Sequence, residues 1–533
     1  SLVHTICQWS GASDVVVGLE GHGREEHVVE ELDLSRTVGW FTSIFPVALS
    51  NSEGFSSLIK STKERLRQLP DKGLGYGVLR YLGEGTGLSN GSDGDPWEIV
   101  FNYLGQYDNL LSESAWFGMS DDPRGSEVST SHVSGVKLTI NSMIVKGELV
   151  LHLGYSGQHY NRETVEDLAS TYQSHLEDLI GHCTSQADQG SVFTPSDYGL
   201  EQDINHQELD SFMATHPGVV AVYGLSGLQE GMLFHSLYDD GVQAYLEQFV
   251  SDIPSVDPVL LKQSWKEILR RHSIFRSSFH YDTFNIPVQC VYDEVALPVA
   301  ELDYSHLDGA AQESALAAFE ESDRDKGIDL DQAPLMRLTL IRLSADRYRM
   351  VWTSHHLLFD GWSLAVLMEE LQEVYAILQS SANLPHYKED LYQDYIRYIG
   401  RQDKYKEEAY WQEYLFGVSA PVLLPYIGNV ADRNKGIGRY GQEFLIFDKD
   451  YTKKLHEYVK ANHLTMNTLM QGVWSYLLYR YSGEGHVVFG VTVSGRPEEL
   501  PGVERRVGMY INTLPFHTVL SEDMEIGSWL QDL

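Results

Sequence analysis

Basic residues are scarce in this chain. Its 533 residues include 39 lysines and arginines against 76 aspartates and glutamates, which gives a formal net charge of −37. With so little positive charge, the surface cannot neutralise a row of phosphates, so the composition argues against a nucleic-acid partner. The same deficit argues against binding to an anionic membrane surface.

Cysteines are fewer still, and long apolar runs are missing. Cys7, Cys183 and Cys290 do not stand at CxxC spacing, so the sequence indicates neither a disulfide framework nor a zinc site. We therefore expect no bound metal and a reducing, cytoplasmic location. No run reaches membrane-spanning length, and no signal peptide opens the sequence. Because the first residue is serine rather than methionine, we expect the chain to be part of a longer protein.

What the chain does contain is one long internal repeat. The segment WSGASDVVVGLEGHGREEH near the start matches YSGEGHVVFGVTVSGRPEEL near the end, and further matches follow. The first three matching pairs share one offset, and the last two follow a slip of three residues. The pairs are Gly11 with Gly483, Gly18 with Gly490, Arg24 with Arg496, Gly39 with Gly508, and Pro46 with Pro515. So many matches in order predict two related folds in tandem.

Between the repeats, helical and strand patterns alternate. Residues 136–155 are typical of two strands around a Lys146-Gly147 turn, and residues 161–182 carry apolar side chains at helical spacing. Residues 186–210 are polar and lack apolar periodicity, so we interpret them as a linker. Beyond the linker we expect helices at 257–271, 363–379, 450–462 and 464–480, and strands at 336–343, 347–354 and 486–493. This alternation favours layered α/β lobes.

The stretch WTSHHLLFDGWS places His355 and His356 where a predicted strand turns into a helix. Both could simply be core residues, and a metal site is less favoured because no further ligand stands at suitable spacing nearby. Successive residues of an extended chain point to opposite sides, so one histidine can face a cleft while the other packs inward. A neutral imidazole beside helix N-terminal N–H groups suits proton transfer from an amine or hydroxyl that attacks an acyl carbon. Asp360 could cap the helix, or it could pair with Arg337 on a nearby strand.

HHLLFDGWS resembles the HHxxxDG signature of the condensation domains of nonribosomal peptide synthetases, whose superfamily includes the chloramphenicol acetyltransferase-like acyltransferases. Four further stretches resemble the other core motifs of that family, in the same order. They are YGLSGLQEGMLFHSLY (223–238), RRHSIFRSSF (270–279), LYQDYIRYI (391–399) and VGMYINTLP (507–515). Together the motifs cover most of residues 215–533. The resemblance implies a two-lobed α/β fold of the chloramphenicol acetyltransferase type.

The N-terminal part resembles the sister family, the epimerization domains of the same synthetases. Its motifs, which are similar to those of the second half of that family, are EGHGREE (20–26), RTVGWFTSIFP (36–46), PDKGLGYG (70–77) and FNYLGQYD (101–108). We therefore expect residues 1–185 to be the C-terminal lobe of an epimerization domain. Residues 211–533 would be a condensation domain, with its N-terminal lobe at about 211–385 and the start of its second lobe at about 386–533. Both domains would be incomplete in this chain.

The resemblance also assigns roles to residues. In the condensation part it places His356 in the cleft between the lobes, as a base or as a group that positions the attacking amine. His355 and an Asp360–Arg337 pair would support the loop, and Gly361 would leave room for substrate and offer its N–H to an oxyanion.

In the epimerization part, the resemblance makes Glu20 the acid/base residue at the substrate α-carbon. Residues 1–185 alone are not expected to epimerize, because the partner histidine of that family lies upstream of this region. Further candidates for the substrate channels are Trp362, Ser494, Asn512, His22, Asn102 and Tyr103. For Trp362, simple packing is the favoured explanation.

The substrates of such domains arrive as thioesters on 4′-phosphopantetheine arms. The resemblance therefore implies donor and acceptor carrier proteins and adjacent adenylation domains as partners, with no cofactor bound directly. A condensation domain that follows an epimerization domain implies a donor with D configuration at its C-terminal residue. The stretch GLSGLQEGMLFHSLYD is also similar to that subclass.

Two other functions compete with this interpretation. The first is a coenzyme A-dependent acyltransferase, which can also carry HHxxxDG but lacks the EGHGRE and FNYLGQ motifs and the tandem arrangement. The second is a non-catalytic fragment that only docks carrier proteins. The intact HHLLFDGWS argues against the second function, but the expected truncation of both domains leaves it open.

Overall fold

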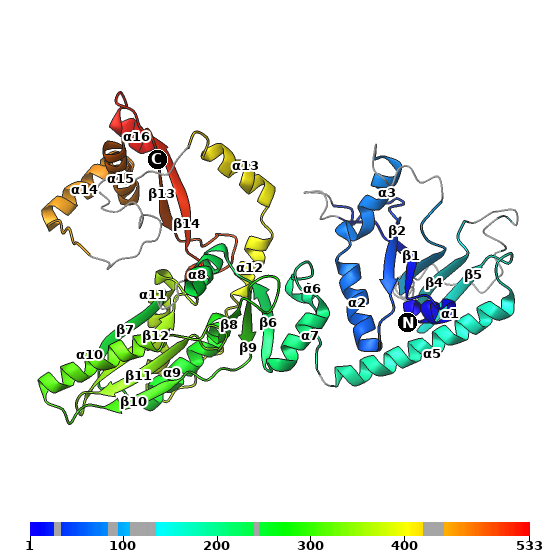
Figure 1. Cartoon of the computed structure of the whole chain (residues 1–533), viewed down its shortest axis with the longest axis horizontal. Helices are drawn as coiled ribbons and strands as arrows, with labels where there is room; N and C mark the ends of the chain where they lie inside the picture. Colours follow the sequence, from blue (N-terminus) through cyan, green and yellow to red (C-terminus); the bar gives the residue numbers. More distant parts are fainter. Residues whose placement is uncertain are drawn as a thin grey trace. The chain divides into compact units, whose positions relative to one another are not determined.

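The computed structural model describes residues 1–25, 33–83, 94–106, 125, 129, 135–188, 190–238, 245–418 and 442–533. The last residue of EGHGREE and the last two of FNYLGQYD lie outside this part. The chain forms two compact units (Figure 1). The first comprises Ser1–Pro217 with Phe284–Ile286, and the second comprises Gly218–Thr283 with Pro287–Leu533. Within the described residues, no helix combines the length and apolar character that a membrane span needs.

The first unit is built on a five-stranded sheet with the order β2-β1-β3-β4-β5. Its strands are β1 (Asp14–Gly21), β2 (Ser43–Ser50), β3 (Ile99–Gln106), β4 (Leu138–Val145) and β5 (Glu148–Tyr155). The predicted hairpin is confirmed, because Lys146 and Gly147 connect β4 to β5 with positive φ angles of 52° and 75°.

Two helices, α1 (Leu2–Ser10) and α5 (Arg162–Ala187), pack together and supply apolar side chains to the core of the first unit. Ile6 and Leu168 meet Leu138 and Ile140 of β4 there. Asn161 caps α5 by accepting a hydrogen bond from the Thr164 N–H. The helix predicted at 161–182 is therefore confirmed, and it continues to Ala187.

The stretch interpreted as a linker contains two short helices, α6 (Pro195–Tyr198) and the start of α7 (His206–Thr215). Each begins with a capping box, Thr194 with Asp197 and Asn205 with Glu208, which satisfies N-terminal N–H groups without any apolar periodicity. These helices pack on α2 (Phe55–Arg67), where Glu64 accepts hydrogen bonds from Ser196. The first compact unit therefore extends to Pro217.

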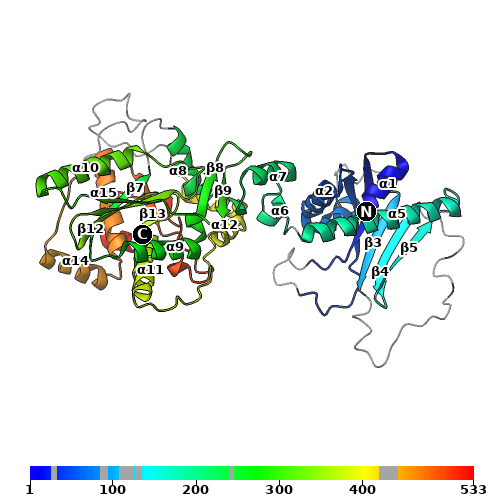
Figure 2. The ribbon, with the colours of Figure 1, turned by 90° about the horizontal axis from the view of Figure 1, so that it is seen from below.

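The second unit contains a four-stranded sheet with the order β10-β11-β12-β7. Its strands are β7 (Leu246–Pro254), β10 (Val299–Asp303), β11 (Met336–Arg342) and β12 (Arg347–His355). Figure 2 shows α10 (Gly309–Asp325) on one face and α9 (Pro258–Arg271) and α11 (Gly361–Gln379) on the other. The side chains agree, since Trp265 of α9 packs on Trp352 and Asp323 of α10 accepts a hydrogen bond from Thr353.

Further elements complete the second unit. A three-stranded sheet has the order β6-β9-β8, with β6 (Val219–Gly224), β8 (Ser277–His280) and β9 (Val288–Tyr292). Among its described residues, the unit's other α-helices and strands are α8 (Gly227–Tyr238), α12 (Gln393–Gly400), α13 (Lys404–Tyr414), α14 (Lys449–Ala461), α15 (Met466–Ser482), β13 (His486–Val493), β14 (Asn512–Val519) and α16 (Ile526–Asp532). The helices and strands predicted beyond residue 210 are all present, with ends shifted by at most two residues.

The internal repeat of the sequence is also a repeat of structure. Gly11 and Gly483 both end a helix in the left-handed conformation, with φ of 72° and 74°. In the strands that follow, Gly18 lies opposite Pro46 across β1 and β2, and Gly490 lies opposite Pro515 across β13 and β14. The predicted pair of related folds is therefore confirmed at the level of strand register.

The repeat extends into the loop after each first strand. Gly23 has a φ of 66°, and an added Cβ would stand 1.7 Å from the Phe41 carbonyl oxygen. Gly495 has a φ of 59°, and its Cβ would stand 1.8 Å from the Tyr510 carbonyl oxygen. Only glycine fits such a position, because a side chain would meet both the backbone strain and the neighbouring carbonyl.

Candidate active sites

The paired histidines stand where β12 passes into α11. His355 is the last residue of β12 and is buried. Its Nδ1 accepts a hydrogen bond from the Leu357 N–H at 3.2 Å, and its Nε2 lies 3.4 Å from the Ser236 hydroxyl. Burial, helped by the neighbouring His356, lowers the pKa of His355 to about 4. His355 is therefore neutral at pH 7 and holds the loop.

His356 is the more accessible of the two, with 22% of its side chain exposed. Its backbone N–H donates to the Tyr245 carbonyl at 2.8 Å, which ties the loop to the residue just before β7. Its Nδ1 lies 2.8 Å from the Phe359 carbonyl oxygen. Because a carbonyl only accepts, the ring proton is assigned to Nδ1. Nε2 is then the ring nitrogen that remains without a described hydrogen-bond partner.

Asp360 is the N-cap of α11 and its side chain is fully buried. One carboxylate oxygen accepts from the Ser363 N–H at 2.8 Å, and the other accepts from the N–H groups of Tyr510 and Ile511 at 3.1 and 3.2 Å. The guanidinium of Arg496 completes the set at 3.2 Å. Asp360 therefore joins the HHxxxDG loop to the segment between β13 and β14.

The first unit brings two of its predicted residues together. Glu20 on β1 and Asn102 on β3 are neighbours across parallel strands, and the Asn102 amide donates to Glu20 Oε2 at 2.7 Å. His22 instead lies 3.4 Å from Glu25 through its Nε2, and its Nδ1 accepts from the Arg24 N–H. Tyr103 is 54% exposed and follows Asn102, so its side chain points to the other face of β3.

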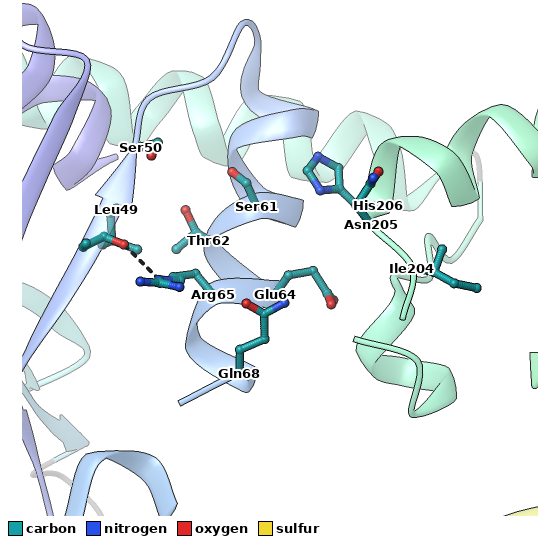
Figure 3. Close-up of a pocket in the computed structure, with 11 residues that line it drawn as sticks. Leu49, Ser50, Ser61, Thr62, Glu64, Arg65, Gln68, Ile204, Asn205 and His206 are labelled. Carbon is teal, nitrogen blue, oxygen red and sulfur yellow. Dashed lines mark hydrogen bonds between the residues drawn. The ribbon is translucent and has the colours of Figure 1, made fainter. Parts of the chain in front are cut away.

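A pocket of about 330 Å³ with a mixed polar and apolar lining also belongs to the first unit (Figure 3). Arg65 and Thr62 of α2, Ala48 to Ser50 of β2 and Asn205 and His206 at the start of α7 contribute to its lining. The Arg65 guanidinium donates to the Ala48 carbonyl at 3.3 Å. The pocket lies at the end of β2 away from Ile44, which is the residue opposite Glu20, so it is separate from the Glu20–Asn102 pair.

Comparison with known proteins decides the family. The model of the condensation-domain family matches residues 2–198 and 219–533, which is nearly the whole chain in two consecutive matches. This chain belongs to the condensation-domain family. The tandem arrangement and the two-lobed chloramphenicol acetyltransferase-like fold predicted from the sequence are confirmed.

Curated relatives match over the whole chain. A linear gramicidin synthase protein of Brevibacillus parabrevis is 38% identical over 539 residues, covering 100% of this chain and 7% of that protein. Bacitracin synthase 3 of Bacillus licheniformis is 34% identical, covering 98% of this chain and 8% of that protein. A mycosubtilin synthase protein of Bacillus subtilis is 35% identical, covering 99% and 20%. The chain spans at most a fifth of the length of these relatives.

The predicted ion pair between Asp360 and Arg337 is wrong. Arg337 of β11 points to the α10 face of the sheet, where its Nε donates to Asp323 at 2.7 Å. Burial alone would raise the pKa of Asp323, but hydrogen bonds from Arg337 and Thr353 outweigh it and lower that pKa. The true partner of Asp360 is Arg496, and its match with Arg24 in the repeat is the sequence signal that marks it.

The remaining candidates of the condensation part lie around this pair. Trp362 is half exposed, its indole N–H donates to the Glu504 carbonyl at 3.0 Å, and its ring lies under the Arg496 guanidinium at 5.6 Å. Gly361, the first residue of α11, has open space where a side chain would stand. Ser494 and Asn512 are exposed, and Asn512 lies opposite Val493, the neighbour of Ser494.

One residue near His356 carries no motif signal and is absent from the sequence-based candidates. Glu247 of β7 lies opposite Ser354 in the strand register, and its Oε2 is 3.8 Å from His356 Nδ1. Only the pairing of β7 with β12 brings it to the histidines, and that pairing is not readable from a local pattern. Glu247 is therefore a site residue that the structure adds.

Proposed function

We propose that the second unit forms a peptide bond between a donor and an acceptor, each held as a thioester on the phosphopantetheine arm of a carrier protein. The observation that carries the proposal is the state of His356. Its Nδ1 is held by the Phe359 carbonyl, so Nε2 is the ring nitrogen that this partly exposed side chain offers to a substrate. Membership of the condensation-domain family supports the same chemistry.

In this proposal the acceptor amine attacks the donor thioester carbonyl, and an N–C bond forms as the C–S bond breaks. His356 Nε2 binds the amine and takes up the proton that it loses. The first N–H groups of a helix have no partner within the helix, so the N–H of Gly361 at the start of α11 is suited to the developing oxyanion. The ion pair between Asp360 and Arg496 holds the HHxxxDG loop against the segment between β13 and β14.

For the first unit we propose epimerization of the donor, with Glu20 as the acid/base residue at the α-carbon. The offset that relates Arg24 to Arg496 also relates Glu20 to Thr492, so the second unit carries no carboxylate at this position. The contact with the Asn102 amide supports a fixed carboxylate. The donor of the second unit would then have D configuration, and the carrier proteins and adenylation domains of one cytoplasmic synthetase would be the partners.

The test of the condensation proposal uses carrier-bound donor and acceptor thioesters and measures the peptide product. His356→Ala should lower the rate about 100-fold or more, in the range of a lost general acid–base group. His386→Ala, at an exposed position outside the site, is the matched control and should keep the rate. Carrier binding should survive His356→Ala. An equal loss in both variants, or no loss in either, would refute the catalytic role and favour a docking function.

Two further measurements test the D configuration of the donor and the role of Glu20 in epimerization. A D-configured donor should condense faster than its L-epimer, and the opposite order would refute the D-donor assignment. For the first unit, α-hydrogen exchange in deuterated water should depend on Glu20 when an upstream lobe is supplied, and Glu20→Gln should abolish it. Exchange that persists in Glu20→Gln would remove Glu20 from that role.

A further inference from the structure

Glu247 lies on the face of β7 that turns toward the core, although its side chain stays 34% exposed. In β7, Glu247 and Phe249 share one face, and this is the face on which Phe249 stacks on Trp352 at 4.9 Å. The residue opposite Glu247 is Ser354, which is fully buried. An ionisable group on a core-facing row is costly unless it has a partner. The Glu247 carboxylate lies at the end of this row, beside the paired histidines. It is therefore a candidate for a functional role rather than a structural one.

In the described part of the chain, no basic side chain forms a hydrogen-bonded ion pair with the carboxylate of Glu247. Within 4 Å the described basic groups offer only His356, whose Nδ1 is 3.8 Å away, too far for a hydrogen bond. That nitrogen already donates to Phe359. The carboxylate is 34% exposed, so it is open to a ligand. Asp252 on the same strand differs from Glu247, because its carboxylate accepts a hydrogen bond from the Arg349 guanidinium at 2.8 Å.

We propose that Glu247 binds the α-ammonium group of the acceptor aminoacyl thioester beside His356. The proposal rests on the condensation function proposed above and adds the residue that recognises the charge of the acceptor. An α-amino group has a pKa near neutrality, about 8, so much of the acceptor arrives as a cation. The Glu247 carboxylate would bind this ammonium group next to His356, the general base that must remove a proton from it.

The steps balance. The ammonium group pairs with Glu247 and transfers one proton to His356 Nε2, which leaves a neutral amine. The amine nitrogen then forms the N–C bond to the donor carbonyl carbon, and the C–S bond breaks. His356 releases this first proton to water, takes up the second proton of the nitrogen as the N–C bond forms, and passes it to the departing thiolate. The products are an amide, a thiol and one proton.

The test separates charge recognition from general binding by using two probes. One is glycyl-aminopantetheine, in which an amide replaces the thioester, and the other is its acetyl counterpart, which lacks the amine. Binding of each to the 533-residue chain is measured by calorimetry at pH 6.5 and low salt. We expect the chain to bind the glycyl probe about tenfold more tightly, a ratio typical of one charge-assisted hydrogen bond in a partly exposed site. Glu247→Gln should abolish this preference, and Glu247→Asp should restore part of it.

The matched control is Asp252→Asn, which removes a carboxylate from the same strand but from the opposite face. It should retain the preference for the glycyl probe. A preference that persists in Glu247→Gln, or an unmodified chain that binds both probes equally, would overturn the role of Glu247 and leave the condensation proposal standing. An unmodified chain that binds neither probe would refute the acceptor site itself, and the role of Glu247 with it.

Discussion

Asp360 and Arg496 lie 136 residues apart in the sequence and meet at 3.2 Å in the interior of the second unit. Both side chains are almost completely buried, and the Asp360 carboxylate also takes three backbone N–H groups. The same arginine donates to the carbonyls of Val503 and Arg506. A single ion pair thus connects the loop that carries His356 with the segment that leads into β14.

Removal of Arg496 is expected to destabilise the second unit strongly. Arg496→Ala would leave the buried Asp360 charge without its cation, and breaking such a pair costs about 3–5 kcal/mol. The measurement is the free energy of unfolding in urea. Arg505→Ala is the control, because Arg505 pairs with Glu369 in an exposed site where a salt bridge contributes less than about 1 kcal/mol. Equal losses in the two variants would contradict the central role of the Asp360–Arg496 pair.

A second buried cation, His272, should make the stability of the second unit depend on pH. His272 is buried between two carboxylates, with Nε2 2.9 Å from Glu370 and Nδ1 3.2 Å from Asp390. Because an ionised carboxylate only accepts, both ring nitrogens carry protons and the ring is an imidazolium. Burial lowers the pKa of His272, but the two carboxylates outweigh burial and raise it above 6.5. Asp390 also accepts from the Val507 N–H, so the charge supports the segment before Tyr510.

The stability that His272 provides should therefore disappear at high pH. A histidine with a raised folded-state pKa stabilises fully below the unfolded value of 6.5, and its contribution is lost as the pH rises through the raised pKa. We expect the difference in free energy of unfolding between the unmodified chain and His272→Gln to shrink from about pH 6 to about pH 9, where the carboxylates stay ionised. A difference that is constant over this range would show that His272 is neutral.

His355 should show the opposite trend. Its pKa is lowered to about 4 by burial and by His356, so the folded chain resists a proton that the unfolded chain accepts below pH 6.5. Stability is then lost as the pH falls from 6.5 towards 4, with a slope of at most about 1.4 kcal/mol per pH unit. The check is urea unfolding of His355→Gln and the unmodified chain at about pH 7 and about pH 5. The advantage of the histidine should be smaller at the lower pH, and a larger advantage there would refute a neutral His355.

The sequence patterns succeeded where the determining interactions are local. Lys146-Gly147 predicted the β4–β5 hairpin, and strand alternation predicted that one histidine of the pair packs inward while the other stays accessible. The partner of Asp360 was missed because Arg337 is nearby in sequence but faces α10, whereas Arg496 reaches Asp360 only through the tertiary fold. Glu247 was missed for the same reason.

Short helices were missed for another reason. The capping boxes of α6 and α7, Thr194 with Asp197 and Asn205 with Glu208, are readable in the sequence, but elements this short show little apolar periodicity. Hydrophobic period is a strong signal only over several turns. The interpretation of residues 186–210 as a linker followed from that gap, and contacts such as Lys63 with Asp197 bind the stretch to the first unit instead.

The repeat itself gives the last prediction, since one substitution can be made at two equivalent positions. Gly23→Ala and Gly495→Ala each place a Cβ within about 2 Å of a carbonyl oxygen at a positive φ, so each should destabilise its own unit. We expect a cost of at least about 1 kcal/mol in each case, the usual cost of a strained backbone position, and more if the carbonyl cannot shift. Gly227→Ala in α8, where the structure leaves open space, is the control and should be neutral or slightly stabilising.

Proteolysis of the two units, followed by mass spectrometry, would assign each loss of stability to its unit. If Gly495→Ala weakened the second unit while Gly23→Ala left the first unchanged, the two loops would not be structurally equivalent, and the tandem relationship would stop at the strands.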